Sequence, residues 1–127
     1  MGPPGGERTF FLRRSVEIEL VKRQGRRVQT PLFNLQARRA GGSPARVGIV
    51  AGKRLGGAVA RNRVKRRFRE LARTVRPRLV RGYEMLVFPR REAVTVRPAA
   101  LRELWLSVLG REGLLVSESD RPCGSSA

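Results

Sequence analysis

The clearest alternation of apolar and polar positions lies between residues 58 and 76. Apolar side chains recur there at i, i+4, i+7 and i+11, which places them in one narrow stripe on an α-helix: Val64, Phe68, Leu71 and Val75. Pro77 ends this helix, because a proline ring cannot continue the hydrogen-bond ladder. We therefore predict a helix over 58–76 that packs through a single face.

Two further stretches have helical spacing. Residues 12–24 carry a mixed apolar face that ends at Gly25, and Ser15 is a candidate N-cap. Residues 96–110 place apolar side chains at i, i+3, i+4, i+7 and i+8, with Pro98 in the first turn and a glycine at the end. We predict helices over both ranges.

Three other stretches are typical of strands. Residues 27–38 are predicted to form one strand, in which Pro31 indicates an edge position or a bulge. Residues 45–51 alternate, and residues 82–89 carry apolar side chains on both faces, as interior strands do. The element order is then α-β-β-α-β-α, which predicts a two-layer α+β sandwich with a sheet of three or slightly more strands.

The two ends of the chain differ from the middle. Residues 1–9 are rich in Gly and Pro, and residues 117–127 are polar and small, so we expect both segments to be disordered. The 127 residues are one domain's worth of chain, and the fold is expected within residues 10–116.

The charge balance points to a polyanionic partner. Lys and Arg number 28 against 10 Asp and Glu, which gives a net charge of +18, and all but three of the basic residues are Arg. A GC-rich genome or a heat-adapted host could explain the excess of Arg over Lys. Neither explains the shortage of acids, because a merely solvated surface mixes both signs. Nucleic acid is the favoured partner, and an anionic membrane surface is the main competitor.

Several classes of function are excluded by composition. The chain has no His, which removes Ser/His/Asp triads and His metal ligands, and one cysteine, Cys123, which cannot form an internal disulfide. No apolar run is long enough to span a membrane, and the first residues do not form a signal peptide. We expect a cytoplasmic protein with no metal site of its own and no catalytic residue.

Cationic side chains cover most of the helix at 58–76 outside its apolar stripe. Only Glu70 is available there for ion pairs, so an ordinary solvated helix is a poor explanation. The preceding loop at 52–57 is basic and rich in Gly, and its amides and the helix N-terminus suit phosphate, although the spacing is not that of a Walker A motif. Arg side chains grip phosphates with two hydrogen bonds, and Asn62 can touch a 2′-hydroxyl.

This segment resembles the protein subunit of bacterial ribonuclease P. The family pattern is R-x-G, three hydrophobic residues, x-K-[KR], and then A, hydrophobic, x-R-N-R, hydrophobic, K-R. In this sequence it reads RVGIVAGKR at 46–54 and AVARNRVKR at 58–66. Weaker features of the family agree as well: a first helix that ends at Gly25, a strand with Phe33 and a last helix with Trp105. The resemblance covers about residues 12–110.

The resemblance implies a fold and a role. The helix at 58–76 would join parallel strands by a left-handed crossover, as in domain 2 of ribosomal protein S5. The chain would be the protein cofactor of a catalytic RNA that removes the 5′ leader of precursor tRNA, with Mg²⁺ bound mainly by that RNA. Its expected partners are the ribonuclease P RNA and precursor tRNA, with no membrane and no obligate protein partner.

The same resemblance implies two groups of site residues. The RNA-binding group is Lys53, Arg54, Arg61, Asn62, Arg63, Lys65, Arg66, Arg67 and Arg69. The group expected to line a cleft for the single-stranded leader is Ile18, Lys22, Phe33, Gln36 and Arg46. The sequence departs from the family in this cleft. Ile18 and Lys22 stand where Phe is usual, Gln36 where Tyr is frequent, and Gly52 where Ser is frequent.

Three alternatives remain. Composition alone would favour a ribosomal or general RNA-binding protein, and the combined motif at 46–66 argues against it. A membrane-active cationic helix needs a wider apolar face than the stripe at 58–76 provides. A self-sufficient nuclease without His would need several carboxylates around a metal, and the sequence has no such cluster.

Overall fold

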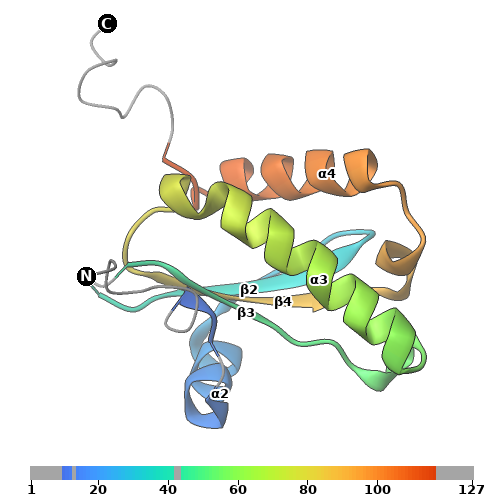
Figure 1. Ribbon diagram of the computed structural model, residues 1–127. Helices are drawn as coiled ribbons and strands as arrows, with labels where there is room; N and C mark the ends of the chain where they lie inside the picture. The colour runs from blue at the N-terminus through green and yellow to red at the C-terminus, as the bar shows by residue number, and fades with distance from the viewer. Residues whose placement is uncertain (1–9, 13, 42–43, 117–127) are drawn as a thin grey trace, which may run out of the picture.

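The computed structural model describes residues 10–12, 14–41 and 44–116 (Figure 1). Its elements are α2 (Ser15–Gln24), β1 (Arg26–Gln29), β2 (Phe33–Arg39), β3 (Arg46–Ile49), α3 (Ala58–Val75), β4 (Tyr83–Pro89) and α4 (Pro98–Arg111). Short 3₁₀ turns lie at Lys53–Leu55 (η1), Arg76–Arg78 (η2) and Arg91–Val94 (η3). The segments 1–9 and 117–127, expected to be disordered, lie outside the described residues.

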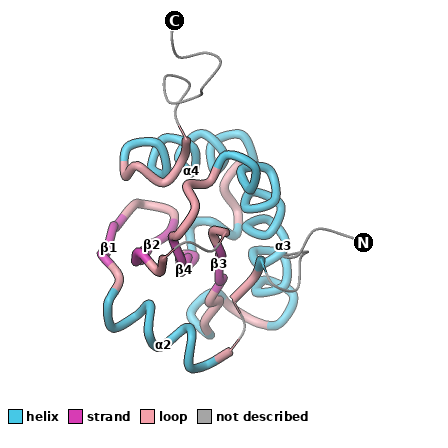
Figure 2. The backbone as a smooth tube through the Cα atoms, turned by 90° about the vertical axis from the view of Figure 1, so that its left-hand side faces the viewer, coloured by secondary structure: helices cyan, strands magenta, loops and turns pink. Residues whose placement is uncertain are grey.

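The sheet has four strands in the order β1-β2-β4-β3. β2 pairs antiparallel with both β1 and β4, whereas β3 and β4 are parallel and are joined through α3. With α3 in front of the sheet and the strands pointing upward, β4 lies to the left of β3 (Figures 1 and 2). The crossover is therefore left-handed, as the resemblance implied and against the usual right-handed rule.

The predicted single strand at 27–38 is wrong, because the chain folds back within it. Pro31 lies in the turn of a β1–β2 hairpin. The Thr30 hydroxyl closes this turn by accepting hydrogen bonds from the backbone N–H of Phe33 (2.9 Å) and of Leu32 (3.3 Å). The observed order is α-β-β-β-α-β-α, and the two-layer α+β class stands.

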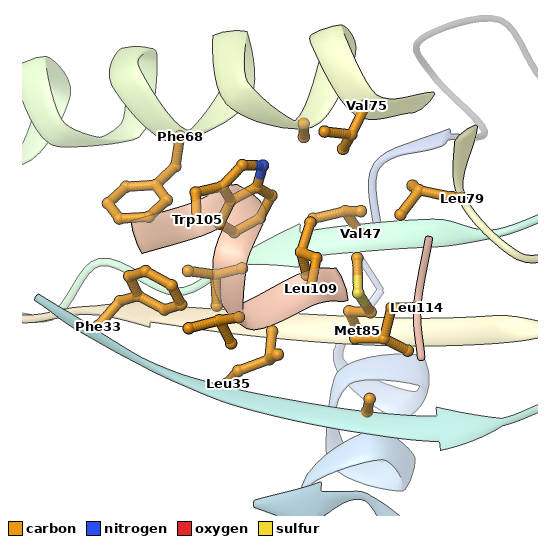
Figure 3. Packing of buried hydrophobic residues seen from close by; sticks show 14 of the residues in the cluster. Phe33, Leu35, Val47, Phe68, Val75, Leu79, Met85, Trp105, Leu109 and Leu114 are labelled. Carbon is orange, nitrogen blue, oxygen red and sulfur yellow. The ribbon is translucent and has the colours of Figure 1, made fainter. Parts of the chain in front are cut away.

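The main core lies between the sheet and the two helices α3 and α4, on the upper side of the sheet in Figure 1. Its centre is an aromatic trio that is fully buried: Phe33, Phe68 and Trp105, from β2, α3 and α4 (Figure 3). The ring centres lie 5.6–5.9 Å apart in edge-to-face geometry, which favours aromatic pairs beyond their buried area. This trio fixes α3 over the sheet.

The opposite face of the sheet is covered in part by α2, through a small cluster of Leu12, Val21 and Leu86. The helix begins at Ser15 and not at residue 12, and its N-cap is Arg14 rather than the predicted Ser15. Leu12 instead lies outside the helix, and its N–H donates to the carbonyl of Val47 in β3 (2.8 Å). The segment before α2 therefore lies along the outer edge of the sheet.

Among the described residues, none of the helices has the length and apolar character needed to cross a membrane.

Candidate nucleic-acid interface

The N-terminal half of α3 presents its cationic side chains outward because its apolar side chains face the core. Val64 and Phe68 are fully buried, and Ala72 and Val75 continue the stripe towards the end of the helix. Two glycines precede the helix, and Gly56 has φ of +117°, a conformation that other residues rarely adopt. This sharp turn after η1 aims the start of α3 away from the sheet (Figure 1).

Six polar side chains of this half-helix have no ion-pair or hydrogen-bond partner within the described ranges. They are the α3 face: Arg61, Asn62, Arg63, Lys65, Arg66 and Arg69. The next turn differs, because Arg73 is paired with Glu70 at 3.2 Å. The Nε atom of Arg61 is buried and has no acceptor, so this guanidinium is held at the surface by packing rather than by a carboxylate. Such unpaired charges suit the phosphates of a nucleic acid.

Arg67, which was predicted to bind RNA, differs from its neighbours because its guanidinium already has partners within the protein. Its NH1 atom donates to two backbone carbonyls, those of Ala93 (3.1 Å) and Val96 (2.7 Å). Arg67 therefore ties α3 to the segment that precedes α4. The position lies beside the apolar stripe, which is why its guanidinium turns inward.

The loop before α3 adds two cations at the side of the sheet. Leu55 is buried and anchors η1, while Lys53 and Arg54 are exposed. They line a hollow of about 950 Å³ together with Arg90 and Arg91 at the end of β4. Arg90 lies 3.8 Å from Glu92, so this basic rim carries one carboxylate.

A second hollow, of about 300 Å³, opens on the α2 face of the sheet. We call it the sheet hollow. Two of its lining residues, Lys22 and Gln36, were predicted for the leader cleft, and the Gln36 amide donates to the Lys22 carbonyl at 3.2 Å. Its polar and aromatic lining also includes residues that sequence reasoning missed: Arg27, Gln29, Asn34 and Phe88. Strand alternation was the available signal, because it places Phe88 on the face of Leu86.

The other predicted cleft residues are not in the sheet hollow. Phe33 is fully buried on the α3 side of the sheet, so its assignment to the cleft was wrong. Arg46 is held by carboxylates near the start of α2 and does not line the hollow either. Ile18 packs against the small cluster of Leu12, Val21 and Leu86, as Phe88 also does. In each case the register of the strand or helix decides which face the side chain takes.

A chain of charged groups attaches α2 to the sheet. Glu17 accepts two hydrogen bonds from Arg46, at 2.8 and 3.2 Å. Arg46 also lies 3.9 Å from Glu84, which pairs in turn with Arg38 at 3.2 Å. The hydrogen bonds from Arg46 are the main cause that lowers the pKa of Glu17 below its usual range. This network fixes the helix that borders the sheet hollow.

Comparison with known proteins agrees with this geometry. The ribonuclease P family matches residues 7–112. The ribonuclease P protein component of Symbiobacterium thermophilum is 35% identical over 113 residues, which cover 88% of this chain and 98% of that protein. That of Chloroflexus aurantiacus is 35% identical over 109 residues, covering 86% of this chain and 81% of that protein.

Solved structures give the same result. The ribonuclease P protein of Thermotoga maritima superposes with a TM-score of 0.72 at 30% identity, covering 79% of this chain and 94% of that one. A mutant ribonuclease P protein of Staphylococcus aureus superposes with a TM-score of 0.78 at 21% identity, covering 86% of this chain and 92% of that one. This likeness supports the fold. The chain therefore belongs to the ribonuclease P family of protein components, the protein subunits of the endoribonuclease that matures the 5′ ends of tRNA.

Proposed function

We propose that this chain is the protein cofactor of ribonuclease P, and that it binds the catalytic RNA through the α3 face. The observation that carries this proposal is that the six side chains of the α3 face have no protein partner within the described ranges. Placing unpaired charges on one helix surface is unfavourable unless a polyanion neutralises them. Lys53 and Arg54 extend the same basic surface onto the preceding loop.

The chemistry belongs to the RNA in this proposal. The chain offers no His, and Mg²⁺ bound mainly by the RNA supplies the metal chemistry of cleavage. The contribution of the chain is electrostatic. Arginines and lysines that contact phosphates near the reaction centre release counterions and reduce repulsion between the catalytic RNA and its substrate. Less Mg²⁺ is then needed for the same folding and substrate binding.

The sheet hollow is the proposed site for the single-stranded 5′ leader of precursor tRNA. Phe88 offers a ring on which a base can stack, and Lys22 and Arg27 can contact the sugar–phosphate backbone. Asn34 lies directly opposite Phe88 in the β2–β4 register, and its side-chain oxygen is buried without a hydrogen-bond partner. An amide in that position can accept a hydrogen bond from a base edge.

The hollow also explains how a leader can bind without the usual aromatics on the first helix. In this chain the ring comes from β4, and amide groups of Gln29, Asn34 and Gln36 surround it. Stacking on one aromatic ring contributes about 1–3 kcal/mol per base, so a single ring supports a weak but useful contact. The reaction would take place in the cytoplasm, where precursor tRNA is processed, without an obligate protein partner.

Reconstitution tests this function. The full chain is added to a bacterial ribonuclease P RNA and a precursor tRNA, and cleavage at the mature 5′ end is followed. We expect strong stimulation with the correct end. Tight, salt-dependent RNA binding without any stimulation would instead favour a ribosomal or general RNA-binding protein.

A further inference from the structure

The carboxylates of the described residues are not spread evenly among the arginines. Most of them neutralise a particular arginine, in the pairs Glu17–Arg46, Glu84–Arg38, Glu112–Arg26, Glu70–Arg73 and Glu92–Arg90, whereas Glu19 pairs with Lys22 and Glu103 has no ion-pair partner within the described residues. Pairing of this kind leaves the α3 face without carboxylates. It also leaves a second group of arginines unneutralised, at the opposite end of the molecule.

This second group, which we call the end surface, consists of Arg39, Arg76, Arg78 and Tyr83. The guanidinium carbon of Arg39 lies 5.7 Å from the centre of the Tyr83 ring, and that of Arg76 lies 4.7 Å from the centre of the Phe10 ring. Arg39 and Arg78 are exposed, and neither forms an ion pair within the described part of the chain. Stacking on a ring holds a guanidinium flat and leaves its N–H edge free for a phosphate.

The backbone that carries the end surface is tied down. The N–H of Ala40 donates to the Gly82 carbonyl at 2.5 Å, and a Cβ at Gly82 would collide with the backbone oxygen of Gly41. The segment after η2 pairs with the chain after α4, through hydrogen bonds from Val80 to Leu114 (2.9 Å) and from Val116 to Arg78 (2.6 Å). The arginines therefore project from a fixed platform, so binding an anion orders little additional chain.

The end surface is separate from the α3 face. Arg69, the last residue of the α3 face, and Arg76 are seven residues apart, which is about 10 Å at 1.5 Å per residue, and the α3 face extends about 12 Å further, to Arg61. Glu70 lies between Arg69 and Arg76, and its side chain is 74% exposed beside Arg73. Arg73, in the interval between the two surfaces, is therefore already engaged by a carboxylate, whereas Arg69 and Arg76 form no ion pair within the described residues.

The end surface is also separate from the sheet hollow. Arg39 and Tyr83 are paired in register and lie on the α3 side of the sheet, beyond the end of its core. Asn34 and Phe88 are paired near the other end of the same strands and lie on the α2 side. A leader held in the hollow would have to pass around the sheet to reach Arg39.

We propose that the end surface binds a second segment of the ribonuclease P RNA, so that the chain bridges two segments of that RNA. This inference rests on the proposed function, because it takes the same RNA as partner. The catalytic RNA is favoured over the leader because the end surface and the hollow lie on opposite faces of the sheet. A large folded RNA can contact both ends of α3 at once, whereas a short single strand in the hollow cannot.

The test is the affinity of the full chain for ribonuclease P RNA alone, measured across a salt titration. The variant is Arg39→Gln/Arg78→Gln, and the matched control is Arg97→Gln/Arg102→Gln. The control removes the same charge from exposed positions at the start of α4 and on it. Thermal melts check that all proteins fold. A third variant, Arg61→Gln/Arg63→Gln, reports on the α3 face separately.

We expect the end-surface variant to bind about tenfold or more weakly than the control at 0.1–0.2 M salt. The slope of log affinity against log salt should fall by about 1.4–1.8, which corresponds to two lost phosphate contacts. An affinity and slope equal to those of the control would overturn the inference. The proposed function would still stand if the α3 variant alone lost affinity, whereas it would fail if the unmodified chain did not bind this RNA at all.

The assembled holoenzyme distinguishes the two RNAs. At saturating chain, the end-surface variant should bind precursor tRNA as tightly as the control does. A loss seen only for precursor tRNA, with normal affinity for the catalytic RNA, would contradict the assignment and place the substrate on this surface.

Discussion

Glu17 on α2 and Arg46 on β3 form a two-point ion pair, with N–O distances of 2.8 and 3.2 Å, across 29 positions of the sequence. Both side chains are about a quarter exposed. Arg46 is the first residue of the family motif that runs through β3 into α3. The pair therefore attaches the helix that borders the sheet hollow to the strand that leads to the α3 face.

We predict that Glu17→Gln destabilises the chain by at most about 1 kcal/mol at neutral pH, since the pair is partly exposed. The folded pKa of Glu17 is lowered, chiefly by Arg46, so the pair contributes fully above the unfolded value of about 4.3. That contribution is lost as the pH falls through the folded pKa. Denaturant unfolding should therefore show a larger difference from the unmodified chain at pH 7 than at pH 3.

The control for this change is Glu103→Gln on α4. Glu103 is exposed and forms no ion pair within the described residues. Its replacement should leave stability the same at both pH values. A difference for Glu17→Gln that is as large at pH 3 as at pH 7 would show that the ion pair is not its cause.

Gly48→Ala should destabilise the fold by about 1–3 kcal/mol through overpacking. A Cβ there would lie 2.7 Å from Leu86 Cδ2 and 3.1 Å from Leu12 Cβ. Gly52→Ala is the matched control, because nothing lies within 4 Å of its Cβ position, and it should change stability by no more than about 0.5 kcal/mol. Equal melting temperatures for the two variants would contradict the packing described under α2.

Phe68→Ala removes one ring of the buried trio and should cost about 3–5 kcal/mol as a core truncation. Val59→Ala on the same helix is the comparison, because Val59 is 79% exposed and its truncation leaves no cavity. Thermal or chemical unfolding of both variants measures the effect. A Phe68→Ala protein as stable as the Val59→Ala protein would mean that the trio does not hold α3 in place.

Phe88→Ala should weaken binding of precursor tRNA to the holoenzyme by about 1–3 kcal/mol, the contribution of one base stacked on a ring. Affinity for mature tRNA, which has no leader, serves as the internal control and should not change. A melt checks the fold, since Phe88 also packs against the buried cluster under α2. Equal losses for both tRNAs would place the leader elsewhere.

Sequence patterning predicted the fold where one periodicity dominates. The stripe from Val64 to Val75 defined α3, and it also identified which side chains face outward. The strand at 27–38 was wrong because alternation continues through a tight hairpin. There the deciding interaction is local, between the Thr30 hydroxyl and the backbone of Phe33.

The site was predicted in part for related reasons. The α3 face depends only on helical geometry, so its cations could be placed from the sequence. The sheet hollow depends on which face of β2 each residue takes, and Phe33 was assigned to the wrong one. Arg67 and Arg46 look like free cations in the sequence, and only the three-dimensional structure brings their acceptors near, 26 to 38 positions away.

The most direct test of the central claim is the Mg²⁺ dependence of precursor-tRNA cleavage by a bacterial ribonuclease P RNA. It is measured without protein, with the unmodified chain, with Arg61→Ala/Arg63→Ala, and with the charge-matched Arg97→Ala/Arg102→Ala. The account predicts that the unmodified chain and the charge-matched control move the midpoint to lower Mg²⁺, and that the α3 variant, although folded, does so much less. The account would be contradicted if the unmodified chain did not lower the Mg²⁺ concentration at which cleavage is half-maximal. It would also be contradicted if the α3 variant lowered that concentration as much as the unmodified chain does.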